Sequence, residues 1–235
     1  MKIDIVTLFP KMFESPFAES IIQRAIKNKI IDLKIYNLRD WAIDSYGSVD
    51  DKPFGGDVGM LIRPEPVYNA LESIKEKTLR PTGTSLDREA TSKIVLMSAR
   101  GKKFTQEKAE ELAKLDNLIL IAGHYEGFDQ RISDFMIDEE ISIGDYVLTG
   151  GELPSMVITD AVARLVPGVL GKDDSSKIES WSEIEIDGKK IRTEEYPQYT
   201  RPQDFMGHKV PEVLIGGDPK KIKKWQEDQI RKNLK

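Results

Sequence analysis

Apolar and polar positions along the first two thirds of the chain follow two alternating spacings. Short runs of apolar, often β-branched residues predict strands, and longer segments with apolar residues three or four apart predict helices. The predicted strands lie at 3–8, 31–36, 93–97, 118–122 and within 141–148. The predicted helices lie at 13–28, 66–77, 105–114, 128–135 and 154–165. Because strands and helices alternate, we expect an α/β fold with a parallel sheet and flanking helices.

Turn-forming residues separate these elements. Residues 44–60 are rich in Gly, Asp and Ser and predict a long loop, and residues 79–92 predict a mobile surface loop. Thr105 precedes a predicted helix and is a suitable N-cap.

The last quarter of the chain has a different pattern. Residues 173–188 are polar and Ser-rich, and the alternating Ile residues at 182–186 indicate a small hairpin within this linker. Segments 211–214 and 219–234 have helical spacing. We therefore expect a main domain at 1–169, a flexible linker at 170–195 and a small, mainly helical domain at 196–235.

Composition narrows the chemistry. The chain has 235 residues and no cysteine, which excludes disulfides, thiolate metal ligands and thiol nucleophiles. Its two histidines, His124 and His208, are far apart in sequence and form no metal-ligand pair. The sequence shows neither a signal peptide nor an apolar run of transmembrane length, so we expect a cytoplasmic protein without a membrane partner.

The net charge of −5 argues against a basic nucleic-acid binder overall, but residues 217–235 carry a net charge of +4. Such a local tail can contact phosphates, although a solvated terminal helix would have the same composition. The chain has no Gly-x-Gly-x-x-Gly after its first strand, no Walker motif and no evident hydrolase signature.

The most specific motif is IGDYVLTGGELP at residues 143–154. Glycines allow close backbone approaches, so this segment can surround a small ligand, although a Gly-Gly pair alone is more often a tight turn after a strand. Four companion strings share the chain with it. They are VDDKPFGGDVGM at 49–60, AGHYEGFDQR at 122–131, AVARLVPGVLG at 161–171 and YTRP at 199–202.

Together, in this order, the five strings resemble the bacterial tRNA (guanine-N1)-methyltransferase family TrmD, of the SPOUT class, from residue 1 to about residue 225. The resemblance implies a C-terminal trefoil knot in the main domain, S-adenosylmethionine as cofactor, and a homodimer. It also implies that guanine N1 of tRNA is methylated immediately 3′ of the anticodon, with activity linked to Mg²⁺. We name no metal ligand, and we expect tRNA rather than DNA as partner.

By this resemblance, backbone and apolar groups of the glycine-rich strings line the cofactor site. The implied residues are Met97, Ser98, Gly123, Ile143, Gly144, Asp145, Tyr146, Val147, Leu148, Gly150, Gly151 and Pro154.

Methylation of guanine N1 requires removal of its proton and stabilisation of the charge that develops on O6. Arg164 matches the family's catalytic arginine for O6; without the resemblance it would be a helix-surface arginine. Glu179 stands where the family has its aspartate base. Asp173 or Asp174 could fill this role if the loop is shifted.

Four residues are candidates for substrate contact: Asp50, Glu126, Asp129 and Arg201. Glu126 can accept hydrogen bonds from the N1 and N2 donors of guanine. Alternatively, Glu126 and Asp129 cap and brace the following helix. His124 replaces an arginine that is common in the family, so a fixed positive charge is not assured there.

Two other functions remain open. One is a SPOUT methyltransferase for another RNA site. The other is a non-catalytic RNA-binding or assembly factor, which the replacements at Glu179 and His124 would allow.

Overall fold

The computed structural model describes residues 1–79, 91–170, 179–186 and 188–234. The chain divides into two compact units, Met1–Gly171 and Lys172–Lys235, and each unit has its own elements. The predicted loop at 79–92 and the alternative bases Asp173 and Asp174 fall mostly or wholly outside the described residues.

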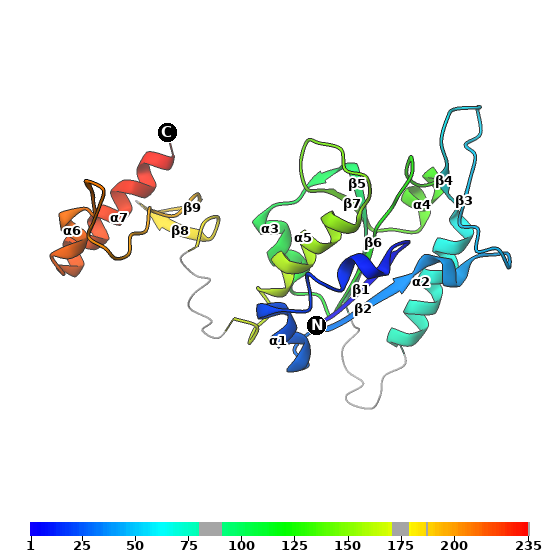
Figure 1. The fold of residues 1–235 in the computed structure, drawn as a ribbon, viewed down its shortest axis with the longest axis horizontal. Coiled ribbons are helices and arrows are strands. Elements are labelled where there is room, and N and C mark those ends of the chain that lie inside the picture. The colour runs from blue at the N-terminus through cyan, green and yellow to red at the C-terminus, as the bar shows by residue number, and fades with distance from the viewer. Residues whose placement is uncertain (80–90, 171–178, 187, 235) are drawn as a thin grey trace. The chain divides into compact units, whose positions relative to one another are not determined.

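The first unit is built on a parallel five-stranded sheet (Figure 1). Its strand order is β2-β1-β6-β5-β7, and every neighbouring pair is parallel. The strands are β1 (Lys2–Thr7), β2 (Asp32–Asn37), β5 (Ser92–Lys103), β6 (Asn117–Ile121) and β7 (Glu139–Ser142). This confirms the predicted α/β class.

Helices cover both faces of this sheet. They are α1 (Ser20–Lys27), α2 (Pro64–Leu79), α3 (Gln106–Leu112), α4 (Gln130–Phe135) and α5 (Glu152–Ala163), with 3₁₀ turns η1 (Pro10–Phe13) and η2 (Leu38–Trp41). No helix in the described part of the chain is both long and apolar enough to cross a membrane.

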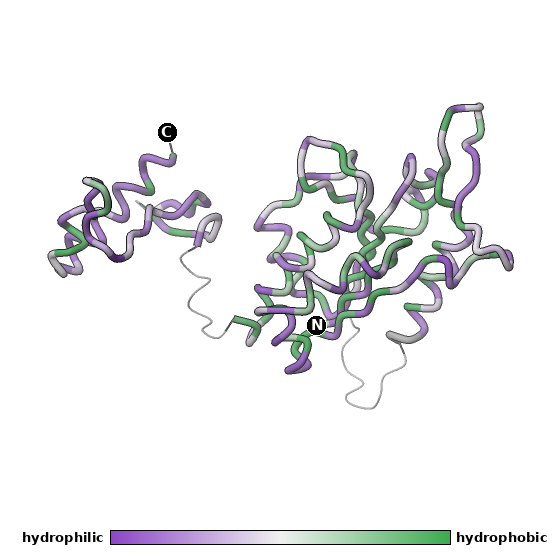
Figure 2. The backbone as a smooth tube through the Cα atoms, in the orientation of Figure 1, coloured by the Kyte–Doolittle hydropathy of each residue, from purple (hydrophilic) through white to green (hydrophobic). Residues whose placement is uncertain are grey.

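The alternation of side chains along the strands creates two apolar cores. Ile3 and Ile5 of β1 pack with α1, α3 and α5 on one face, whereas Val6 packs with α2 and α4 on the other. Leu118 and Ile119 of β6 divide in the same way. Figure 2 shows the hydrophobic stretches concentrated in the sheet. Buried strands with helices on both faces therefore read as nearly continuous apolar runs.

Strand β5 is longer than the predicted 93–97. It continues to Lys103, with a register shift against β7 between Met97 and Lys102. Gly101 permits this close pairing, because a Cβ there would lie 2.6 Å from backbone atoms of Glu140 and Ile141. Apolar spacing missed the extension because its residues are polar or small.

Other element boundaries also differ from the predictions, three of them in ways that affect the site or the loops. The helix expected at 13–28 begins only at Ser20, because Glu19 is extended and Ser20 has a left-handed φ of +58°, which interrupts helical geometry there. The loop at 44–60 contains the two-residue strand β3 (Asp50–Asp51), which pairs with β4 (Leu61–Ile62). Strand β7 ends at Ser142, so residues 143–148 are loop.

The second unit contains a hairpin of β8 (Glu183–Ile186) and β9 (Lys189–Arg192), as the alternating isoleucines predicted. It also holds the short pair β10 (Asp204–Phe205) and β11 (His208–Lys209) and the helices α6 (Glu212–Ile215) and α7 (Pro219–Asn233). Asp218 caps α7 by accepting hydrogen bonds from Lys220 N and Lys221 N.

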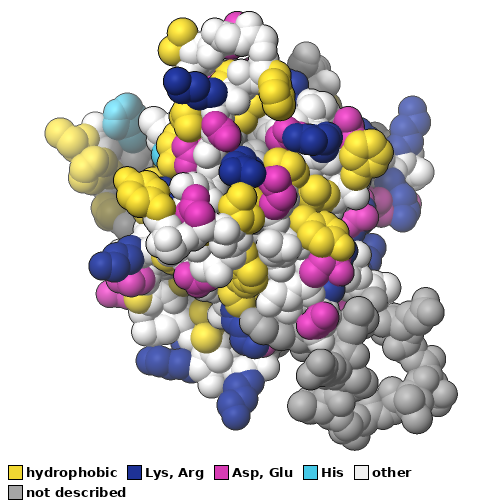
Figure 3. Space-filling view, turned by 90° about the vertical axis from the view of Figure 1, so that its right-hand side faces the viewer, with side chains coloured by type: hydrophobic (Ala, Val, Ile, Leu, Met, Phe, Trp, Pro, Cys, Tyr) yellow, Lys and Arg dark blue, Asp and Glu magenta, His cyan; other side chains and the backbone are white. Residues whose placement is uncertain are grey.

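One face of the molecule, on the side of α2, α4 and the β3–β4 pair, mixes side chains of all types (Figure 3). Among the described residues on this face, hydrophobic, acidic and basic groups alternate, and neither sign of charge gathers into a broad patch.

Candidate active site

The main cavity opens at one edge of the sheet, beside the carboxyl-terminal parts of the neighbouring strands β6, β5 and β7. Its volume is about 590 Å³, and it is lined by residues of β5 and of the loops that follow β6 and β7. Ligands of open α/β sheets bind at this carboxyl edge. The size is within the range of small-molecule sites, about 300–1,000 Å³.

Glycines hold the two lining loops against each other. Gly151 N donates a hydrogen bond of 2.7 Å to Gly123 O, which ties the loop after β7 to the loop after β6. A Cβ on Gly151 would lie 2.8 Å from Gly123 N and 2.9 Å from Met97 Cβ. A Cβ on Gly123 would collide with the Phe128 ring. Only glycine fits these two positions without displacement of neighbouring atoms.

The irregular segment of β5 forms a third wall. Residues 98–101 lie between the two paired stretches of the strand, and Ser98, Ala99 and Arg100 line the cavity. Arg100 Nη2 donates a hydrogen bond of 3.4 Å to Gln130 Oε1 at the start of α4. A break in strand pairing thus directs side chains into the cavity.

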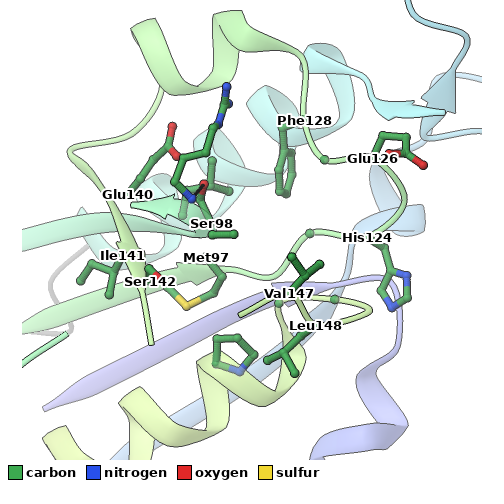
Figure 4. A pocket seen from close by; sticks show the side chains of 18 of the residues that line it. Met97, Ser98, His124, Glu126, Phe128, Glu140, Ile141, Ser142, Val147 and Leu148 are labelled. Carbon is green, nitrogen blue, oxygen red and sulfur yellow. Dashed lines mark hydrogen bonds between the residues drawn. The ribbon is translucent and has the colours of Figure 1, made fainter. Parts of the chain in front are cut away.

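The lining is apolar in the middle and polar at two ends (Figure 4). In this view Met97, Val147 and Phe128 lie across the centre, Glu140 and Ser142 lie at one end, and Glu126 and His124 at the other. An apolar body between separated polar groups suits an amphipathic small molecule.

The structure brings together eleven of the twelve predicted cofactor residues as lining of this one cavity. They are Met97, Ser98, Gly123, Ile143, Gly144, Tyr146, Val147, Leu148, Gly150, Gly151 and Pro154. The twelfth, Asp145, is exposed and pairs with Lys103 at 2.5 Å. Its side chain therefore points to solvent, so only the backbone of Asp145 can contact a molecule in the cavity.

Several lining residues were not among the predicted ones, notably Leu96, Arg100, Phe128, Glu140 and Ser142. These residues share one feature, which is that they lie at or near the carboxyl ends of β5, β6 and β7. This feature predicts a common site only when the order of the strands in the sheet is known, and the sequence did not supply that order.

The turn after β6 places Glu126 on the cavity. Tyr125 has φ +61°, a left-handed conformation that a side chain disfavours. Glu126 N donates to Met60 O at 3.1 Å, and a Cβ on Gly59 would collide with the Glu126 side chain. The loop at 44–60 therefore closes directly onto Glu126.

Asp129 caps the N-terminus of α4, which is one of the two roles predicted for it. Its carboxylate accepts hydrogen bonds from Arg131 N at 3.0 Å and from Arg131 Nε and Nη2 at 2.7 Å. These bonds to Arg131 lower the pKa of Asp129 below its usual value. Neither Asp129 nor Asp50, which lies on β3, lines the cavity.

The two predicted catalytic residues lie outside the lining. Arg164 is the C-cap of α5, whereas the cavity is lined by Gly151 and Pro154 at the other end of that helix. Glu179 belongs to the second unit, where its carbonyl accepts a bond of 3.0 Å from Ser182 N.

Arg201 is also in the second unit. The Arg201–Pro202 peptide bond is cis, and Arg201 lines a separate hollow of about 300 Å³ with Tyr199, Phe205 and Lys209. Aromatic and cationic groups together are compatible with contact to an unpaired base.

Among the residues that the structure describes, no group of three or more His, Asp or Glu side chains is arranged to hold a metal ion. We therefore assign no residue to Mg²⁺. Magnesium often takes only one or two carboxylates together with substrate phosphates.

Comparison with known proteins gives a consistent result. The family model described as tRNA (Guanine-1)-methyltransferase TrmD matches residues 1–235. A tRNA (guanine-N(1)-)-methyltransferase of Dehalococcoides mccartyi strain CBDB1 is 47% identical over 236 residues, covering 100% of this chain and 88% of the relative. The enzymes of that name from Geobacter sp. strain M21 and Bacillus cereus strain AH820 are both 46% identical, covering 100% and 97% of this chain and 87% and 86% of theirs.

Proposed function

Since the chain belongs to the tRNA (guanine-1)-methyltransferase family TrmD, we propose that it methylates N1 of the guanosine immediately 3′ of the anticodon in tRNA, with S-adenosylmethionine as methyl donor. The observation that carries this proposal is the cavity at the carboxyl edge of the sheet. Eleven predicted cofactor residues meet there, nine of them from the strings 122–131 and 143–154 and two, Met97 and Ser98, from β5.

The cavity fits the proposed cofactor. Apolar side chains such as Met97, Ile143 and Leu148 can cover the adenine and the carbon chain, and loop backbone offers hydrogen-bonding groups. Gly123 and Gly151 keep the walls free of side chains. Bound S-adenosylmethionine would supply a methyl group activated on a sulfonium.

The remaining chemistry belongs to the protein. Glu126, at one end of the cavity, is suited to accept hydrogen bonds from the guanine edge and so orient it. Glu179 removes the N1 proton, and Arg164 donates hydrogen bonds to O6 as negative charge develops. Donor and acceptor need little more than alignment at short distance.

Arg164 can serve the cavity only from a second copy of the chain. Arg164 follows Pro154 by ten positions along the helix, which is about 15 Å along the axis at 1.5 Å per residue. That is longer than an arginine side chain reaches. We therefore propose a homodimer in which Arg164 and Glu179 act on the cavity of the partner subunit.

An exposed apolar surface favours the same conclusion. Leu153 and Val157 stand on one side of α5 and are about half exposed, and Phe9 and Met12 in and beside η1, which contacts α5, are exposed as well. Isolated apolar residues on a surface are normal, but a group on touching elements is typical of an interface. We propose that this surface is part of the dimer contact.

The remaining assignments follow from the family. We propose that residues 1–169 form the catalytic domain with its trefoil knot, 170–195 the linker that carries Glu179, and 196–235 the tRNA-binding domain. The basic α7 and the Arg201 hollow support contact between the last segment and RNA.

The test is labelled methyl transfer from S-adenosylmethionine to two tRNA transcripts in the presence of Mg²⁺. One transcript carries guanosine immediately 3′ of the anticodon, preceded by another guanosine, and the matched transcript carries adenosine at the target. We expect transfer to the first transcript alone, with the methyl group mapped to N1. Transfer to both transcripts, or to another position, would show a different RNA site, and cofactor binding without any transfer would indicate a non-catalytic RNA-binding protein.

A further inference from the structure

A buried carboxylate lies directly behind the cavity. Glu152, in the first turn of α5, is 1% exposed, and its Oε1 accepts a hydrogen bond of 2.8 Å from Thr7 Oγ1 at the end of β1. The Thr7 hydroxyl in turn accepts a bond of 3.0 Å from Phe9 N, which leaves its proton directed to Glu152. The carboxylate is thus fixed in place by Thr7, 145 positions away in the sequence.

Two residues of the cavity wall touch this carboxylate. His124 Nε2 lies 3.5 Å from Glu152 Oε2, and a Cβ on Gly150 would collide with both groups. Gly150 and His124 line the cavity. The glycine backbone and the imidazole therefore lie between the carboxylate and the cavity.

Within the described part of the chain, Glu152 pairs with no lysine or arginine, and its ion-pair partner is His124 alone, which carries a charge only when protonated. A buried anion is costly unless hydrogen bonds or a positive charge compensate it. Thr7 and the N-terminal end of α5 supply part of this compensation.

The charge acts most strongly on the part of the cavity that Gly150 and His124 line. A ligand group against this wall would lie within roughly 10 Å of the carboxylate, a distance over which charges in a protein interior still interact. The two carboxylates that line the cavity, Glu126 and Glu140, are more exposed, so water screens them more strongly.

Given the proposed function, we propose that Glu152 determines specificity for the methyl donor over the spent cofactor. S-adenosylmethionine and S-adenosylhomocysteine share an ammonium and a carboxylate, and differ by the methyl group and the positive charge of the sulfonium. A buried anion behind the cavity favours the sulfonium form and has no such preference for the neutral thioether. Glu152 thereby limits inhibition by the product.

The test is calorimetric titration of the full-length protein with each of the two compounds. In Glu152→Gln, which keeps the shape of the side chain, we expect about tenfold weaker binding of S-adenosylmethionine, the effect of one charge pair at this range. Binding of S-adenosylhomocysteine should change less than about twofold, since a neutral thioether gains nothing from the charge.

Two further variants separate charge from folding. Asp160→Asn removes an exposed carboxylate from the same helix and should leave both affinities unchanged. Glu152→Asp retains the charge and should keep the preference for the sulfonium even if both ligands bind more weakly. Thermal unfolding of each variant reports the fold, and if Glu152→Gln does not fold, Thr7→Val, which releases the carboxylate, should reduce the preference instead.

Equal weakening of both ligands in Glu152→Gln, or no weakening of either, would overturn the inference and leave Glu152 a structural residue. Wild-type protein that binds neither compound would instead reject the proposed cofactor, and the inference with it. Wild-type binding together with an unaltered ratio in the variant rejects the inference alone.

Discussion

At the scale of single residues, the site depends on positions where a side chain is excluded. Gly123 and Gly151 touch each other's loops through backbone, and a methyl group at either would meet neighbouring atoms closer than van der Waals contact. The sequence showed both residues as glycines within motif strings. The structure identifies the neighbouring atoms that leave no room for a side chain at either position.

Gly151→Ala tests this requirement. The added Cβ would lie 2.8 Å from Ala122 Cα, so we expect a loss of about 1–3 kcal/mol of unfolding free energy, as for overpacked cores, and weaker cofactor binding. Urea unfolding and calorimetry measure the two effects. The matched control is Gly216→Ala, where the nearest atom would be 3.6 Å away, and it should stay within about 0.5 kcal/mol of wild type.

Glu179→Gln tests the proposed base. The amide cannot accept the N1 proton, so single-turnover methyl transfer should be abolished while S-adenosylmethionine binds nearly as in wild type. Glu185→Gln, an exposed carboxylate in the same unit, should leave turnover intact. Near-normal turnover in Glu179→Gln would exclude this residue as the base and leave Asp173 and Asp174 as the candidates for that role.

At the scale of elements, an ion-pair network joins α3 to the edge of the sheet. Glu111 of α3 accepts from Lys93 of β5 at 2.5 Å and from Lys108 at 2.7 Å, and both lysines also reach Glu139 of β7. Hydrogen bonds from the two lysines lower the pKa of Glu111 to about 2. The network ties together β5 and β7, two of the strands whose carboxyl ends form the cavity.

This pKa gives the stability a defined pH dependence. The ordinary value is 4.5, so the unfolded chain takes up a proton at Glu111 before the folded protein does, and the stabilisation is lost as the pH falls from about 5 to about 2. Because the side chain is about half exposed, we expect Glu111→Gln to cost at most about 1 kcal/mol at pH 7. The difference from wild type should shrink toward pH 2 and in 1 M salt; a difference independent of both would contradict an ionic origin.

At the scale of the whole molecule, the site is expected to be complete only in a dimer. The structure supports this through one element: α5 begins at the cavity with Gly151 and ends with Arg164. One rigid helix cannot present both ends to the same small ligand. The proposed second copy would resolve the geometry, and the exposed Leu153 and Val157 offer a surface for it.

Mixed dimers test the arrangement. One subunit carries a defective cofactor cavity, Gly151→Val, with Arg164 and Glu179 intact, and the other carries Arg164→Ala and Glu179→Gln with an intact cavity. If the catalytic residues serve the partner's cavity, one of the two sites in each mixed dimer is complete, and we expect about half the wild-type activity per dimer from methyl-transfer assays. Each homodimer alone should be inactive, and an inactive mixed dimer would place all groups of a site in one subunit.

The sequence by itself determined the alternation of strands and helices, the hairpin at 183–192 and the cap at Thr105, whose hydroxyl accepts from Lys108 N. These features depend on spacing along the chain and on neighbours a few residues away. It also marked most of the cavity wall, because glycine-rich loops have local constraints that a motif preserves.

Only the tertiary structure decided which segments meet. The strand order β2-β1-β6-β5-β7 brings Phe128 and Glu140 to the cavity and Thr7 to Glu152, and the register shift in β5 turns Arg100 inward. None of these contacts has a periodic signature, since each joins residues that are distant in sequence. They follow from how the sheet is ordered and packed, which a reading of neighbouring residues does not contain.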